Sequence, residues 1–270
     1  VLKADAGILN IDKIALTKMV ENAESSDVIL KLEKETKDDT LYYHITASAD
    51  GKEIYEEGNA GGKVEVTVPY NATFKGVTFS VYYVKDSTTK ELVESKYDTE
   101  NKTLTWSTAH FSTYQVEDNA IASITNGEET TYYSTIQEAI DDATDGQTVA
   151  LAKDSSIEEV KIESSKVVTL DLNGKTLTTT AAEAIKVYEG TLTIEDTSIA
   201  KTGVINATNL KTAQNAIVVS GNEAKFVFNS GRFVSTGSYG VGITQNATVV
   251  VNGGTMECYI APLSGNNTEG

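Results

Sequence analysis

Apolar and polar residues alternate with a period of two over most of the chain, and this pattern predicts a protein built mainly from β-strands. In the first half, such runs occupy residues 28–32, 41–45, 64–68, 77–84 and 103–107. Their alternation is typical of antiparallel strands with one buried and one solvated face. The pair Asp50-Gly51 predicts a hairpin turn, residues 58–62 predict a flexible loop, and Pro69 is expected to close a strand.

One segment of the first half has a helical period instead. Residues 11–25 are predicted to form an amphipathic helix, with Asp12 in its first turn and apolar positions at Ile11, Ile14, Ala15, Met19, Val20 and Ala23. Together with the strands, this helix predicts a β-sandwich with one added helix over residues 1–118.

The second half repeats one phrase four times: an apolar strand, a turn at glycine and a second apolar pair. The turns at Gly174, Gly203, Gly231 and Gly254 lie 23 to 29 residues apart. Three short strands fit into each repeat, and a repeat of this length indicates coils that bury their apolar faces by stacking on one another. We therefore predict a three-faced parallel β-helix over residues 119–270.

A second helix is predicted near the start of this solenoid, at about residues 134–144. Ser134 or Thr135 can serve as its N-cap, Glu138 completes a capping box with Thr135, and Gly146 lies just beyond its end. Its apolar stripe consists of Ile136, Ala139, Ile140 and Ala143. We expect this helix to cover the otherwise exposed end of the first coil.

Two parts of the chain resemble known families. The segments Val64–Pro69, Val81–Val84 and Thr108–Tyr114 resemble a small β-rich module of large surface proteins from Gram-positive and gut bacteria. The segments Tyr132–Asp141, Gly146–Val149 and Val168–Leu177 resemble the opening of pectate-lyase-like β-helix domains in bacterial surface and adhesin-type proteins. These resemblances imply a right-handed β-helix and a secreted protein of the cell surface or cell wall.

Charge and composition narrow the class of partner. The chain has 22 basic and 39 acidic residues, a net charge of −17 that disfavours nucleic acid, anionic lipid and polyanionic sugars. No apolar run reaches the roughly 18 residues of a membrane span, so no membrane insertion is expected in this segment.

The start lacks a signal-peptide layout and the repeat ends in a partial coil, so we expect a trimmed chain with further coils in its parent. The oligomeric state is left open.

The superfamily that the second half resembles includes polysaccharide lyases and hydrolases, so the coils are searched for catalytic residues. The resemblance implies a calcium cluster with an Arg or Lys base in the lyases, and several Asp residues with a His and an Arg in the hydrolases. Here Arg232 is the sole arginine, the coils contain no histidine, and Asp171, Glu195 and Asp196 form no evident ladder. We predict no catalytic, cofactor-binding or metal-binding residue and expect solvated carboxylates, with weakly bound calcium at an acidic corner left open.

The remaining reactive side chains are predicted to be structural. His110 is expected to anchor a strand together with Phe111, His44 to lie within a strand, and the lone Cys258 to be a core thiol. Asp141 and Asp142 are expected on the solvated face of the second helix. Three tyrosines of the coils share no register and are not predicted to form a sugar platform: Tyr188, Tyr239 and Tyr259.

The sequence therefore predicts a non-catalytic structural or adhesive segment of a secreted bacterial cell-surface protein. Glycans and host or cell-wall surface components are the expected partners. The alternative is a carbohydrate-binding or polysaccharide-degrading β-helix protein whose site lies along one face of the coils.

Overall fold

The structure, a computed structural model, describes residues 2–23, 27–37, 40–54, 58–70, 72–208, 211 and 214–265. The chain divides into two compact units. The first consists of the residues up to Thr73 together with Val77–Asn119, and the second consists of Phe74–Gly76 together with the residues from Ala120 onward. A short segment from the first half of the chain thus belongs to the second unit.

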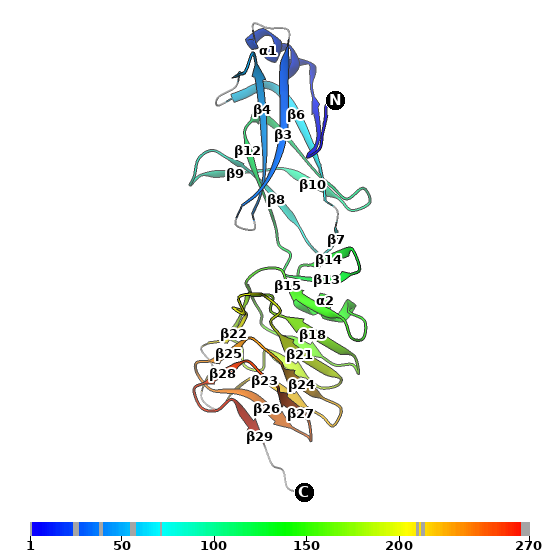
Figure 1. The fold of residues 1–270 in the computed structure, drawn as a ribbon, viewed down its shortest axis with the longest axis vertical. Coiled ribbons are helices and arrows are strands. Elements are labelled where there is room, and N and C mark those ends of the chain that lie inside the picture. The colour runs from blue at the N-terminus through cyan, green and yellow to red at the C-terminus, as the bar shows by residue number, and fades with distance from the viewer. Residues whose placement is uncertain are drawn as a thin grey trace. The chain divides into compact units, whose positions relative to one another are not determined.

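The first unit contains two antiparallel sheets, as the alternating pattern predicts (Figure 1). Sheet A has the strand order β1 (Leu2–Ala4), β2 (Gly7–Ile11), β6 (Gly58–Pro69), β11 (Thr103–Phe111) and β10 (Ser95–Asp98). Sheet B has the order β3 (Val28–Lys37), β4 (Thr40–Ala49), β12 (Thr113–Asp118), β8 (Phe79–Val84) and β9 (Lys90–Val93), with β5 (Lys52–Glu53) paired to β4. The β4–β5 hairpin turns at Asp50 and Gly51, whose φ angles of 51° and 76° are left-handed.

The core of this unit lies between the two sheets. It is formed by the inward residues of both, and its largest fully buried side chains are Trp106, Tyr43 and Tyr114. The ring of Trp106 lies 5.7 Å from those of Tyr43 and Tyr114. At the corner where β11 passes into β12, the Tyr114 hydroxyl donates a 2.8 Å hydrogen bond to the carbonyl of His110 and fixes the change of sheet.

The predicted helix of this unit is α1 (Lys13–Ala23). Asp12 precedes it as its cap and accepts a 2.7 Å hydrogen bond from the Ala15 N–H, so it does not lie within the first turn. Only part of the predicted apolar face is buried: Ala15 and Met19 are fully buried, whereas Ile14 is 60 % exposed.

The predicted loop at residues 58–62 is wrong, because these residues begin strand β6. Their backbone continues to pair with β11 beyond a bulge. A side chain at Gly62 would come within 2.5 Å of Asp12 Oδ1 and the Ala15 N atom, so glycine here permits the close approach of α1.

The second unit is a parallel β-solenoid, which confirms the prediction from the repeat. In the described part of this unit, fifteen coil strands form three sheets in which each strand pairs with the equivalent strand of the next coil (Figure 1). Sheet C contains β15 (Thr148–Leu151), β18 (Val167–Asp171), β21 (Thr191–Glu195), β24 (Lys225–Phe228) and β27 (Thr248–Val251). Sheet D contains β16 (Ser155–Ser156), β19 (Thr176–Thr179), β22 (Val204–Ala207), β25 (Arg232–Ser235) and β28 (Thr255–Cys258). Sheet E contains β17 (Val160–Ile162), β20 (Ile185–Val187), β23 (Asn215–Ser220), β26 (Tyr239–Thr244) and β29 (Leu263–Gly265).

Stacked apolar rows fill the interior of the five coils. In sheet C, Leu170, Ile194 and Phe228 follow one another in register, and all three are fully buried. Corner residues add ladders of their own: the Asn252 side-chain amide donates to Asn229 Oδ1 at 2.9 Å, one coil below. The residues that recur in the sequence are therefore those that pack and turn.

Sheet C extends past β15 of the first coil through antiparallel strands that precede this coil in the sequence. These are β13 (Ala122–Asn126), which pairs with β15, β14 (Glu129–Tyr133), and β7 (Thr73–Lys75), which pairs with β14. Beside them lies α2 (Ile136–Asp142), shorter than predicted but with the predicted cap, since the Glu138 N–H donates to Thr135 Oγ1 at 3.1 Å. Its buried residues Ile136, Ala139 and Ile140 join the solenoid core.

Candidate functional site

The carboxylates singled out on the coils meet at one corner, where β18 and β21 of sheet C turn toward sheet D. Asp171 is only 5 % exposed, although the alternation of its strand predicts an outward position. It accepts hydrogen bonds from the Asn173 N–H at 2.8 Å and from the Thr197 N–H at 2.9 Å. The Thr197 hydroxyl also donates to it. Asp171 therefore joins the corner of the second coil to that of the third.

Asp196, in the third coil, joins the same two corners from the other side. It is 1 % exposed and accepts hydrogen bonds from the N–H groups of Gly174 (2.9 Å), Ser198 (3.1 Å) and Gly203 (2.7 Å). Burial by itself raises the pKa of Asp196, but the hydrogen bonds from Ser198, Gly203 and Gly174 outweigh this effect and hold the pKa below its ordinary value. The group is thus a buried carboxylate that is stabilised in its charged form.

The expectation that these carboxylates are solvated is wrong for Asp171 and Asp196. Both are screened from water by the residues that donate to them, and some of those donors belong to the neighbouring coil. Glu195, between Asp196 and a buried strand position, stays partly exposed. The two aspartates share no strand pattern, because Asp171 directly follows the buried Leu170 whereas Asp196 follows the outward Glu195; what they share is a corner glycine a few residues later, Gly174 or Gly203.

The sole arginine is also paired. Arg232 in β25 makes a bidentate contact with Glu257 in β28, through Nε at 2.9 Å and the guanidinium NH2 at 2.6 Å. The guanidinium beside it lowers the pKa of Glu257. Both side chains are about half exposed on the outer face of sheet D, so this contact is a surface ladder between adjacent coils.

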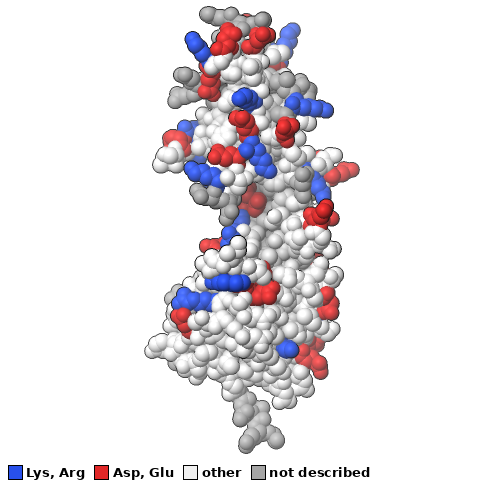
Figure 2. Space-filling view, in the orientation of Figure 1, with Lys and Arg blue, Asp and Glu red and all other residues white. Residues whose placement is uncertain are grey.

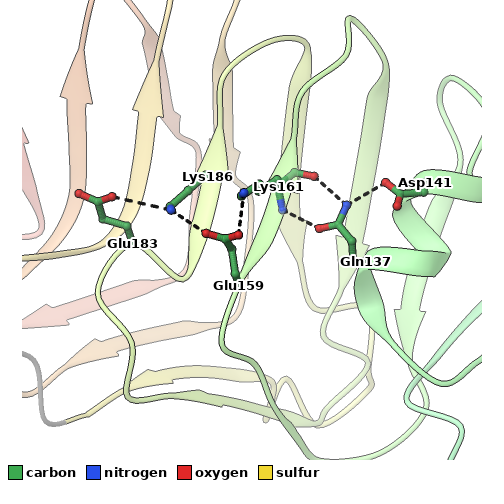
Figure 3. A network of polar contacts seen from close by, with 6 residues as sticks. All are labelled: Gln137, Asp141, Glu159, Lys161, Glu183 and Lys186. Carbon is green, nitrogen blue, oxygen red and sulfur yellow. Dashed lines mark hydrogen bonds and ion pairs between the residues drawn. The ribbon is translucent and has the colours of Figure 1, made fainter.

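A longer polar network crosses the outer face of sheet E (Figure 3). Glu159 contacts Lys161 at 2.7 Å and Lys186 of the next coil at 2.6 Å, and Glu183 lies 4.0 Å from Lys186. Hydrogen bonds from the two lysines lower the pKa of Glu159. Acidic and basic side chains are likewise interspersed over the face drawn in Figure 2 rather than gathered by sign.

The same network reaches α2 through Gln137. The Gln137 side chain accepts a 2.7 Å hydrogen bond from the Lys161 N–H and donates a 3.1 Å hydrogen bond to the Lys161 carbonyl. Lys166 then closes the other end of the helix, because its ammonium donates to the carbonyls of Ile140, Asp141 and Ala143 at 2.9 to 3.1 Å. Helix α2 is thereby fixed to the first coil.

A shallow depression of about 350 Å³ lies beside this helix and is lined by Lys75, Tyr133, Glu138, Asp141 and Asp142. Its lysine is already paired: Asp142 Oδ2 accepts from Lys75 Nζ at 2.6 Å and from the Tyr133 hydroxyl at 2.5 Å. These hydrogen bonds lower the pKa of Asp142, with the Lys75 bond as the largest cause. Asp142 is therefore about half exposed, as expected for the solvated face of the helix, but its carboxylate is paired with Lys75.

The two histidines differ in their surroundings. His110 stacks on Tyr83, with ring centroids 4.8 Å apart and planes only 3° from parallel, and its neighbour Phe111 is buried. His44 lies between Thr113 and Glu35: Nδ1 is 2.9 Å from Thr113 Oγ1, and Nε2 is 2.9 Å from Glu35 Oε2. Sequence reasoning missed this chain of three, because its members are 9 and 69 residues apart.

Cys258 and the coil tyrosines form no common site. Burial raises the pKa of the Cys258 thiol to about 11, which leaves it protonated at neutral pH. Tyr188 is 37 % exposed and Tyr259 is 75 % exposed, and they lie at different corners from Tyr239 in β26.

Among the described residues, no group of three or more His, Cys, Asp and Glu side chains is arranged to hold a metal ion. Neither helix in the same part of the chain is long and apolar enough to cross a membrane. No protein-family model, curated protein or solved structure matches the chain.

Proposed function

We propose that the chain is a non-catalytic structural or adhesive segment of a secreted bacterial cell-surface protein. The observation that carries this proposal is the use that the solenoid makes of its charged residues. Asp171 and Asp196 are buried and occupied by backbone N–H groups, and Arg232 is held by Glu257. Catalytic groups need access to a substrate, whereas these groups join one coil to the next.

The setting is proposed from the sequence motifs. The resemblance of Gly146–Val149 and Val168–Leu177 to pectate-lyase-like domains supports a right-handed solenoid of that type. It also supports a location at the cell surface or cell wall, where glycans or host surface components are the proposed partners. The net charge of −17 supports a partner that is not a polyanion.

Within this role, α2, β13 and Gln137 form what we call the first-coil cap. Helix α2 covers the apolar interior, β13 pairs with the edge of β15, and Gln137 occupies the backbone groups of Lys161 in β17. Unpaired strand edges invite association with other chains, so such a cap favours a rod that does not polymerise through this end.

The test is a direct assay for turnover. The full chain, with and without added Ca²⁺, is incubated with a panel of neutral and acidic polysaccharides, and new reducing ends and unsaturated products are measured. We expect none above the level of heat-unfolded protein. Product formation that Arg232→Ala abolishes would replace this proposal with the polysaccharide-degrading alternative. Antibodies against the chain should also label intact cells that make the parent protein, and labelling only after lysis would contradict the surface location.

A further inference from the structure

The outer face of sheet B in the first unit carries an ordered row of side chains. Tyr43, Val81 and Tyr114 are buried in the core, so their neighbours along the strands point to the opposite face. Across that face, Tyr42 in β4 lies directly opposite Gln115 in β12, and Gln115 lies opposite Tyr82 in β8. Two partly exposed tyrosines thus flank one glutamine on three adjacent strands.

The spacing of this row follows from the sheet. Tyr42 and Tyr82 are two strands apart, which places their backbones about 9.6 Å from each other. Leu92, directly opposite Tyr82 on β9, continues the row and is 65 % exposed. The result is a strip of exposed and partly exposed side chains that crosses four strands, with Gln115 between the two tyrosines.

Polar groups in fixed positions border the strip. His44 is held by Thr113 and Glu35, and the Gln115 side-chain amide donates to Glu117 Oε1 at 2.7 Å. Binding sites for polar organic molecules combine aromatic surface with a few oriented hydrogen-bonding groups. A pyranose ring matches this combination, because its faces are apolar and its edge carries hydroxyl groups.

We infer that the outer face of sheet B binds a neutral, extended β-linked glycan, with sugar rings stacked on Tyr42 and Tyr82 and their hydroxyls bonded to Gln115. Two features select this ligand. The separation of the tyrosines suits two rings of an extended chain that are not adjacent to each other, and a strip that crosses four strands suits a polymer rather than a compact molecule. The excess of acidic residues in the chain disfavours a polyanionic one. This inference rests on the proposed adhesive function, for which it names the class of glycan and a site on the first unit; a failure of glycan binding would leave the turnover and surface-labelling tests of that function unaffected.

One residue modulates the strip in the free protein. Lys90 Nζ lies 4.1 Å from the centroid of the Tyr82 ring and is paired with Glu117, so it reaches across the ring from β9 toward β12. A sugar that stacks on Tyr82 competes with this ammonium for the ring. Removing the Lys90 side chain is therefore expected to favour the glycan.

The experiment is calorimetric titration of the full chain with neutral hexasaccharides: cellohexaose, xylohexaose, mannohexaose, laminarihexaose and chitohexaose. Polygalacturonate oligomers serve as the acidic comparison. We expect binding to at least one neutral β-linked hexasaccharide and none to the acidic one. Tyr42→Ala and Tyr82→Ala should each weaken that binding at least tenfold, Tyr42→Phe should retain it, and Lys90→Ala should tighten it.

The matched control is Tyr259→Ala, which removes an exposed tyrosine of the solenoid and should change nothing. Thermal unfolding of each variant, followed by the fluorescence of the buried Trp106, shows whether the first unit remains folded. If no neutral hexasaccharide binds to the wild-type chain, the inference is wrong. It is equally wrong if folded Tyr42→Ala and Tyr82→Ala bind as tightly as the wild type, or if Lys90→Ala weakens binding.

Discussion

The side-chain amide of Gln137 pairs with both backbone polar groups of Lys161, as the next residue of a β-strand would. One glutamine on a helix thus replaces a strand at the edge of β17. Replacing it with Leu removes two hydrogen bonds and leaves the backbone N–H and carbonyl groups of Lys161 without these partners. We expect Gln137→Leu to lower the free energy of unfolding of the second unit by about 1–3 kcal/mol.

Gln137→Leu should also make the protein associate in a concentration-dependent way, because the Lys161 backbone groups become available to another chain. Size-exclusion chromatography with light scattering measures this. Glu189→Leu is the control, since it adds an exposed leucine at a coil corner without opening a strand edge. A Gln137→Leu protein that stays as monomeric as Glu189→Leu would show that the amide does not protect the edge.

The buried carboxylate of Asp196 should be required for the stability of the solenoid. Asp196→Ala removes the acceptor for three backbone N–H groups, and we expect a loss of about 3 kcal/mol. Glu195→Ala, its partly exposed neighbour, should cost less than about 1 kcal/mol.

Chemical unfolding distinguishes the two units, because the one tryptophan, Trp106, lies in the first unit and its fluorescence reports that unit alone. Circular dichroism follows the unfolding of both units, so a transition seen by circular dichroism but not by Trp106 fluorescence reports the solenoid.

The same residue predicts a dependence on pH. The pKa of Asp196 is lower in the folded protein than its ordinary value, so the folded state binds this proton less readily than the unfolded state does. Its contribution is therefore fully present above the unfolded pKa, near 4, and is lost as the pH falls through the lower folded pKa. In unfolding titrations, the difference in stability between wild type and Asp196→Ala should be constant from pH 7 to about 5 and shrink below about 4. A difference that stayed constant to pH 2 would mean that the charge of Asp196 is not what the corner needs.

Glycine is required at position 203 because of this carboxylate. A Cβ atom there would lie 2.6 Å from the Leu172 Cβ and 2.7 Å from the Asp196 Cγ. Gly203→Ala should therefore destabilise the second unit by about 2 kcal/mol or more, whereas Gly265→Ala, where nothing lies within 4 Å, should be neutral. Equal denaturation midpoints for the two variants in the solenoid transition would contradict the packing of this corner.

Cys258 should react slowly with thiol reagents. With a pKa of about 11, roughly one thiol in a thousand is ionised at pH 8, and only the thiolate reacts. Mass spectrometry after treatment with iodoacetamide should show little modification of the folded chain at pH 8, and rapid modification once the chain is unfolded in urea. Equally fast reaction in both states would show an exposed, ordinary thiol.

Much of the fold is readable from the sequence because its signals are local. The turns at Gly174, Gly203, Gly231 and Gly254 recur at a near-constant spacing, and the Thr135–Glu138 capping box starts a helix within four residues. The prediction of a loop at residues 58–62 is wrong because three glycines in five residues indicate a flexible segment, whereas Gly62 instead permits the close approach of α1 to strand β6.

The side-chain arrangements could not be predicted in the same way, because they depend on residues brought together from different coils or strands. Burial of Asp171 requires Thr197 from the next coil, and the His44 contacts require strands β3 and β12. The strip on sheet B depends on the pairing register of β4, β12 and β8, which a single sequence does not specify.

The proposed first-coil cap has a consequence for how such proteins change over evolutionary time. Helix α2 is held by hydrogen bonds between Gln137 and Lys161 and between Lys166 and the Ile140 carbonyl, and none of these bonds depends on how many coils follow. Each later coil meets the one before it through the same in-register pairing. A duplicated or deleted coil would therefore alter the length of the rod and leave its beginning intact, so that length can vary between descendants while the start of the solenoid stays the same.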